Sequence, residues 1–171
     1  KPTFDMTRGE DGFVSYEVNP HLAHDTDGTI REAKRLYSTI SRPNVMIKVP
    51  ATVEGIPAIS SLIGQGINVN ITLIFSLKTY KDVRDAYIDG LEIFYRSGGD
   101  LSKVSSVASF FVSRVDTKID SEIDARSVNA NSDLKSLYST AAISNAKIAY
   151  RDFRETFNGA KFQKMTDRHA R

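Results

Sequence analysis

The sequence lacks cysteine in all of its 171 residues. This absence excludes disulfides, thiolate metal sites and a cysteine nucleophile. It agrees with a reducing compartment, and we expect the protein to be cytoplasmic.

The sequence also lacks any apolar run near the roughly 20 residues that cross a bilayer, so no membrane association is expected. The opening "KPTFDMTRGEDG" has no apolar core of a secretory signal. Since it does not begin with methionine, further residues are expected upstream.

No charge of one sign dominates the sequence. The 23 Lys and Arg residues and 21 Asp and Glu residues are spread along the chain, with a net charge of +2. Without a basic block or basic–aromatic segments, nucleic acid is not an expected partner. Hydrophobic residues make up 40% and charged residues 26%, as in an ordinary globular domain. We expect a single domain over residues 1–171.

Short apolar runs alternate with longer amphipathic ones. The runs predict strands at 12–18, 44–50, 68–76 and 104–116, and helices at 27–40, 54–66 and 77–99. A later stripe predicts one long helix, started by a cap at Asn131 or Ser132 and ending before Gly159. The residues of this stripe are Leu134, Leu137, Tyr138, Ala141, Ala149, Tyr150, Phe153 and Phe157.

Apolar strands that alternate with helices predict an α/β fold with a parallel sheet. The segment after the first strand, "EVNPHLAHDT", contains no glycine, which disfavours a dinucleotide-binding sheet and favours a (β/α)8 TIM barrel. Such a barrel needs eight strands and about 250 residues. We therefore expect an incomplete barrel of about four βα units plus a long C-terminal helix. Two explanations stay open: the chain is a piece of a longer protein, or several copies complete one another as a homo-oligomer.

Strand parity predicts one polar face and one aliphatic face. The polar parity comprises Ser15 and Glu17, Met46 and Lys48, Asn70 and Thr72, and Ser109, Phe111 and Ser113. The aliphatic parity comprises Val14, Ile47, Val49, Ile71, Leu73, Ala108 and Val112. Arg114 breaks the pattern, so we expect it beyond the end of the fourth strand.

Lys48 stands in the otherwise apolar stretch "NVMIKVPAT". An ordinary lysine is neutral in roughly one molecule in 2,500 at pH 7, and burial favours the neutral amine. A neutral amine forms a Schiff base with a ketone or aldehyde. Glu17, through a water held by Thr72, could move the protons that this addition needs. The alternative is that Lys48 reaches solvent from the strand end with Glu17 as its ion-pair partner.

Arg114 and Ser109 could together hold a phosphate, because a guanidinium matches phosphate oxygens. The alternative is a surface arginine paired with Asp116 or Asp120. Asn70, if buried, needs hydrogen-bond partners, either a substrate hydroxyl or a neighbouring backbone.

His21 and His24 form an H-x-x-H pattern beside Asp25. With three histidines in the chain, no cysteine and a loop setting, a role in the loop or at a helix start is preferred. We assign no metal and no cofactor.

Four blocks together resemble transaldolases, in the longer-chain branch that includes bifunctional transaldolase/glucose-6-phosphate isomerases. The blocks are "GFVSYEVNPHLAHDTDGTI", "PNVMIKVPAT", "GINVNITLIFS" and "SVASFFVSRVDTKID", and "AISNAKIAY" extends the resemblance into the last helix. The resemblance implies a cofactor-independent (β/α)8 barrel of the pentose phosphate pathway. Such enzymes transfer a dihydroxyacetone unit from a ketose phosphate such as sedoheptulose 7-phosphate to glyceraldehyde 3-phosphate.

The resemblance also implies roles for seven residues. They are Lys48 as the Schiff-base lysine, Glu17 as the proton-handling carboxylate, Asn70 and Thr72 as contacts to substrate and the catalytic water, Ser109 and Arg114 as the phosphate clamp, and Phe111 as a pocket wall.

The resemblance covers only the central part of a transaldolase. The family's first strands, with a catalytic aspartate and a "TSNP"-type stretch, would precede Lys1, and its last two strands would follow Arg171. We expect these 171 residues by themselves to be weak or inactive as an enzyme. A fructose-6-phosphate aldolase and a non-catalytic half-barrel remain alternatives.

Overall fold

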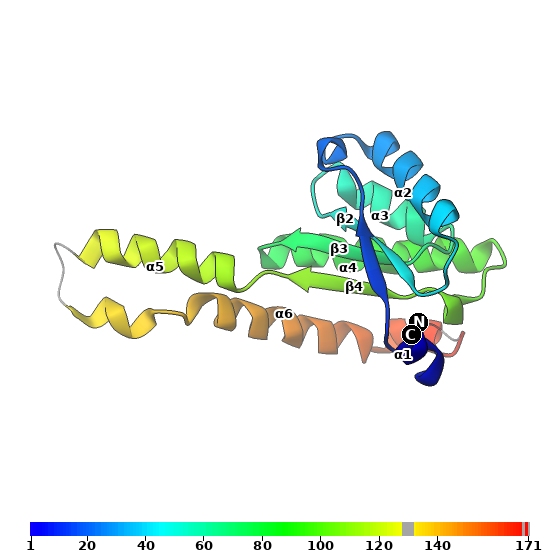
Figure 1. The fold of residues 1–171 in the computed structure, drawn as a ribbon. Coiled ribbons are helices and arrows are strands. Elements are labelled where there is room, and N and C mark those ends of the chain that lie inside the picture. Colours follow the sequence, from blue (N-terminus) through cyan, green and yellow to red (C-terminus); the bar gives the residue numbers. More distant parts are fainter. Residues whose placement is uncertain (128–131, 169, 171) are drawn as a thin grey trace.

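The computed structural model describes residues 1–127, 132–168 and 170 of the chain (Figure 1). In chain order the elements are α1 (Pro2–Met6), β1 (Val14–Glu17), η1 (Pro20–Leu22), α2 (Thr26–Ile40), β2 (Val45–Pro50), α3 (Gly55–Ile63), β3 (Val69–Ile74), α4 (Leu77–Arg96), η2 (Leu101–Lys103), β4 (Ser106–Phe110), α5 (Ser113–Ser127), η3 (Ser132–Leu137), α6 (Ala141–Phe157) and α7 (Ala160–Thr166).

The four strands form one parallel sheet in the order β1-β2-β3-β4. Helices α2, α3 and α4 connect successive strands, as parallel pairing requires. The predicted fold class is confirmed: the chain folds as consecutive βα units of a partial barrel. Helix α5 extends beyond the sheet with η3 and the start of α6 beside it, and α6 then runs back along β4 (Figure 1).

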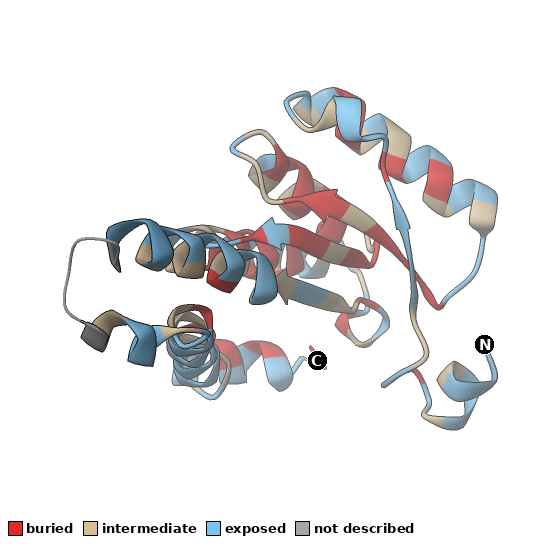
Figure 2. Cartoon of the chain, turned by 60° about the vertical axis from the view of Figure 1, so that its left-hand side comes forward, coloured by how far each residue is buried: buried red, intermediate tan, exposed pale blue. Residues whose placement is uncertain are grey.

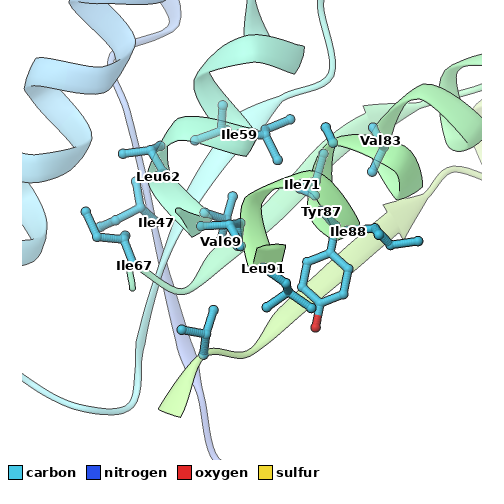
Figure 3. Packing of buried hydrophobic residues seen from close by; sticks show 14 of the residues in the cluster. Ile47, Ile59, Leu62, Ile67, Val69, Ile71, Val83, Tyr87, Ile88 and Leu91 are labelled. Carbon is cyan, nitrogen blue, oxygen red and sulfur yellow. The ribbon is translucent and has the colours of Figure 1, made fainter. Parts of the chain in front are cut away.

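The core lies between the sheet and helices α3 and α4. Ile47, Val49, Val69 and Ile71 alternate along β2 and β3 and are at most 1% exposed. Complete burial of one such side chain stabilises a fold by about 1.5–3 kcal/mol. Figure 3 shows the strand residues of this core beside those of the helices, which include Ile59, Leu62, Val83, Ile88 and Leu91.

Gly90 allows α3 and α4 to approach each other closely. A Cβ at this position would lie 2.6 Å from the Ile63 Cβ and 2.8 Å from the Ser60 carbonyl oxygen. Both distances are shorter than real Cβ contacts allow, so any larger residue would push the helices apart.

The sheet is exposed where a closed barrel would be covered. All four residues of β1 are exposed, including Val14 and Tyr16, whereas β2 and β3 are mostly buried (Figure 2). Val107 of β4 is exposed as well. An edge strand with bare apolar side chains agrees with the prediction of an incomplete barrel.

The fourth strand is shorter than predicted. The strand expected at 104–116 ends at Phe110, and α5 begins at Ser113. Ser113 and Val112 therefore do not belong to the alternating pattern of a strand. Arg114 lies beyond the strand end, as predicted, in the first turn of α5.

The long C-terminal helix is interrupted. Ser139 has a left-handed backbone (φ 55°), so the helical stretch divides into η3 and α6. The predicted cap at Asn131 lies outside the described residues, as does the side chain of Ser132. Gly159 follows the end of α6 as predicted, and α7, which the sequence did not predict, begins after it.

Asp116 of α5 holds the start of α6. Thr140, at the N-cap, makes no side-chain cap, and instead the Asp116 carboxylate accepts a hydrogen bond of 2.8 Å from the Ala142 N–H. One and two turns further along α5, Asp120 accepts from the Ser139 N–H and Asp124 accepts from the Tyr138 hydroxyl. The hairpin is thus held by carboxylates from one face of α5.

No helix in the described ranges combines the length and the apolar character that crossing a membrane demands.

Candidate active site

Strand register brings three of the predicted site residues into one row. Glu17 on β1 is paired with Lys48 on β2, and Lys48 is paired with Asn70 on β3. Their neighbours in sequence, such as Ile47 and Val49, point to the helix-covered core. The row therefore lies on the opposite face of the sheet, which is the interior side of a barrel.

Lys48 and Glu17 form an ion pair on this face. The Lys48 Nζ donates to the Glu17 Oε1, and the lysine side chain is 28% exposed. Met46, two residues earlier on the same face, is buried, whereas the Lys48 amine reaches the open face. An ion pair fits both interpretations of Lys48, because structural and catalytic pairs share this geometry. Glu17 is mostly exposed, so the pair contributes little to stability.

Asn70 is held by two hydroxyl groups on different strands. Its amide donates 2.8 Å to the Ser15 Oγ of β1, and its carbonyl oxygen accepts 2.8 Å from the Ser109 Oγ of β4. These two hydrogen bonds hold the amide group between β1 and β4. The predicted alternatives for its partners were a backbone or a substrate, and the observed partners are side chains. Parity predicts Ser15 on this face but assigns it no role, so its bond to Asn70 is a contact that sequence reasoning missed.

Thr72 lies one step further along the same face. It is paired with Pro50, two residues beyond Lys48, and is buried. Its carbonyl oxygen accepts a hydrogen bond of 2.8 Å from the Ala51 N–H. Its hydroxyl has no hydrogen-bond partner in the part of the chain that the structure describes.

A bulge follows Thr72 and corrects the predicted parity. Ile71 pairs with Ala108 and Ile74 pairs with Phe110, so Thr72 and Leu73 together stand opposite one residue of β4. Leu73 takes a left-handed conformation (φ 62°) and is exposed, not part of the aliphatic face as predicted. Such a conformation costs a non-glycine residue about 1–2 kcal/mol. Bulges of this kind redirect side chains beside functional sites.

Arg114 carries an available positive charge at the end of this face. Its Cζ lies 4.8 Å from the centre of the Phe111 ring, a cation–π contact. The predicted alternative partners are engaged elsewhere, because Asp116 and Asp120 accept from backbone N–H groups of the hairpin. Among the described residues Arg114 has no ion pair. The Ser109 hydroxyl donates to Asn70 and not to a group shared with Arg114, so the predicted clamp is not joined by a direct hydrogen bond.

The residues of the H-x-x-H pattern lie in the segment between β1 and α2. Asp25 caps α2 by accepting 2.8 Å from the Gly28 N–H, and the His24 Nδ1 lies 3.1 Å from the Glu54 Oε2. Across the described ranges, no three His, Asp or Glu residues gather closely enough to hold a metal ion.

A cavity of about 470 Å³ lies away from this site, at the free edge of β4 under α6 and α7. Its lining is mostly aromatic and aliphatic, and Arg84 at its side is held by Asp85 and Asp152. None of the predicted site residues lines it.

Comparison with known proteins gives consistent matches. The family model described as transaldolase/fructose-6-phosphate aldolase matches residues 2–168. A transaldolase of Acidothermus cellulolyticus is 49% identical over 171 residues, which are 100% of this chain and 45% of that protein. Transaldolase 1 of Streptomyces avermitilis is 53% identical over 163 residues, 95% of this chain and 42% of that protein. A transaldolase of Thermobifida fusca is 47% identical over 171 residues, which are 100% of this chain and 46% of that protein. The chain thus spans less than half the length of these relatives.

Proposed function

Because the chain belongs to the transaldolase/fructose-6-phosphate aldolase family, we propose that it supplies the Schiff-base centre of a transaldolase. The reaction is transfer of a dihydroxyacetone unit from a ketose phosphate, such as sedoheptulose 7-phosphate, to glyceraldehyde 3-phosphate. The observation that carries the proposal is the row of Glu17, Lys48 and Asn70 on the open face of the sheet. The chain provides one partial-barrel domain of such an enzyme.

Lys48 is the nucleophile. Glu17 accepts a proton from its Nζ within the ion pair, and the neutral amine adds to the C2 carbonyl of the ketose. The resulting carbinolamine loses its hydroxyl as water when Glu17 returns the proton, directly or through a water at the unpartnered Thr72 hydroxyl. The product is a protonated Schiff base.

The Schiff base then accepts the electrons of the C3–C4 bond. Cleavage leaves an enamine on Lys48, and the C4 hydroxyl loses its proton as the leaving aldose forms its aldehyde. The resemblance assigns this proton to an aspartate on an earlier barrel strand. The enamine carbon next attacks the acceptor aldehyde, and water hydrolyses the new Schiff base to restore the lysine.

Asn70, Ser109, Phe111 and Arg114 bind the substrate. Asn70 offers a pre-oriented amide beside the lysine, which suits the hydroxyls of the dihydroxyacetone unit. Arg114, without a carboxylate partner among the described residues, supplies the charge for a phosphate. Phe111, whose ring contacts the Arg114 guanidinium, forms a wall of the pocket.

Borohydride trapping tests the proposal. We expect the longest chain that contains these residues, incubated with a ketose phosphate and reduced, to carry a dihydroxyacetone adduct on the peptide that contains Lys48. Lys48→Met should abolish the adduct, whereas Lys78→Met, at an exposed lysine of α4, should retain it. Absence of any adduct in the unsubstituted protein would refute the mechanism and favour a non-catalytic half-barrel.

The family description also names fructose-6-phosphate aldolase. That activity would use the same lysine and release free dihydroxyacetone. Omitting the acceptor aldehyde separates the two, because a transaldolase needs the acceptor for turnover and an aldolase does not. We place the activity in the cytoplasmic pentose phosphate pathway.

A further inference from the structure

The bulge at Leu73 decides where Phe75 points. Without an extra residue, strict alternation from Ile71 would send Phe75 into the helix-covered core. With the bulge, Ile74 enters the core, where it is fully buried, and Phe75 turns to the other side and is 40% exposed. A phenylalanine in this position contributes little to the core, and its ring is available for contacts on the open face.

Phe75 stacks on the ring that supports Arg114. The centroids of the Phe75 and Phe111 rings are 4.9 Å apart with an angle of 28° between the planes. The Arg114 Cζ lies 4.8 Å from the Phe111 centroid, so the three side chains are linked through the central ring. A guanidinium over an aromatic ring still has its N–H groups available for an oxyanion.

Backbone hydrogen bonds hold the two phenylalanines in this arrangement. The Phe111 N–H donates 2.9 Å to the Ile74 carbonyl oxygen, which continues the pairing of β3 and β4 past the end of the strands. The Asn145 side chain of α6 donates 3.2 Å to the Phe75 carbonyl oxygen. The stack is therefore supported from both the sheet and the hairpin.

From this geometry we infer that Phe75 is a positioning residue for phosphate binding. It keeps the Phe111 ring, and through it the Arg114 guanidinium, in the orientation that receives the phosphate end of the ketose. Phe75 itself touches no reacting atom. The inference rests on the proposed function and adds to it a residue that decides affinity for phosphorylated over unphosphorylated substrates.

The test uses Phe75→Leu in the longest chain that contains these residues. A stacked aromatic pair contributes about 0.5–1.5 kcal/mol, so we expect the KM for sedoheptulose 7-phosphate to rise about 2- to 12-fold. The inhibition constant of inorganic phosphate should rise by the same factor, and kcat should stay within about 2-fold. Trapping with dihydroxyacetone, which has no phosphate, should be unchanged.

Two further variants separate positioning from general packing. Phe75→Tyr keeps the ring and should retain the original KM. Phe153→Leu removes a comparable ring, 43% exposed and 4.8 Å from Phe157, and should change neither constant. If Phe75→Leu does not fold, Asn145→Ala, which removes only the bond to the Phe75 carbonyl, should raise both constants in the same direction.

The outcomes distinguish this inference from the proposed function. If the unsubstituted protein gives no trapped adduct with any ketose, the proposed function fails and this inference fails with it. If trapping succeeds but Phe75→Leu leaves the KM and the phosphate inhibition constant unchanged, only the positioning role is overturned. An equal loss of dihydroxyacetone trapping would also overturn it, because the effect would then not concern phosphate.

Discussion

Asp116 should be the most sensitive residue of the α5–α6 hairpin. Its side chain is almost completely enclosed, with the residue 8% exposed, and its carboxylate accepts the Ala142 N–H at the start of α6. Thr140, at the N-cap position, makes no side-chain cap of its own. Asp116→Ala would therefore leave a buried N–H without a partner and remove a negative charge from a helix N-terminus.

The expected cost follows from these two losses. Removing a capping side chain costs about 0.5–2 kcal/mol, and leaving a buried donor unsatisfied costs about 1–3 kcal/mol. Because the two terms overlap, we expect a loss of about 2–3 kcal/mol. In a domain of this size each kcal/mol lowers Tm by about 2–4 °C, so Tm should fall by about 4–12 °C.

Thermal unfolding followed by circular dichroism measures this effect. Asp116→Asn keeps an acceptor and should lie between the original protein and Asp116→Ala. Asp120→Ala, one turn later on the same helix, removes a more exposed carboxylate with a longer bond of 3.1 Å to Ser139 and should lower Tm by less than about 3 °C. Equal effects of the two alanine variants would show that burial of the cap does not set its contribution.

Four other outcomes are expected. Glu17→Gln should slow Schiff-base trapping about 10²- to 10⁴-fold with little change in Tm, since the carboxylate moves protons in the proposed mechanism and is mostly exposed; an unchanged trapping rate would exclude it as the proton carrier. Gly90→Ala should destabilise the protein by about 1–3 kcal/mol in urea unfolding because of the close contact with α3, whereas a gain from helix propensity would contradict that packing. Burial raises the pKa of Tyr80, with a contribution from Asp152, and of Tyr87 to about 12 each. Since unfolded tyrosines ionise near a pKa of about 10, the stability from this pair is present below about pH 10 and lost as pH rises toward about 12. Absorbance titration that finds both ionised near their ordinary pKa in the folded protein would refute this. The 171 residues alone should transfer dihydroxyacetone far more slowly than a full-length relative in a coupled assay, because the described sheet is open, and equal rates would contradict this.

The sequence by itself determined the order of the βα units and the two faces of the sheet. Alternation with a period of two is a local property of a strand, so the sequence alone suffices to put Lys48 and Asn70 on one face and Ile47 and Val49 on the other. Lys48 is also recognisable as a charge inside an apolar run. The position of Arg114 beyond the strand follows from its break in parity.

Only the tertiary structure decided what these residues contact. Asn70 takes its partners from strands 55 residues earlier and 39 residues later, and no local pattern encodes that choice. At the bulge, two residues of β3 stand opposite one residue of β4. The extra residue reverses the alternation of side chains along β3 and brings Phe75 beside Phe111. Arg114 has no carboxylate partner among the described residues, because Asp116 and Asp120 accept hydrogen bonds from backbone N–H groups at the start of α6. Side-chain direction is local, whereas pairing between distant strands and helices depends on the whole fold.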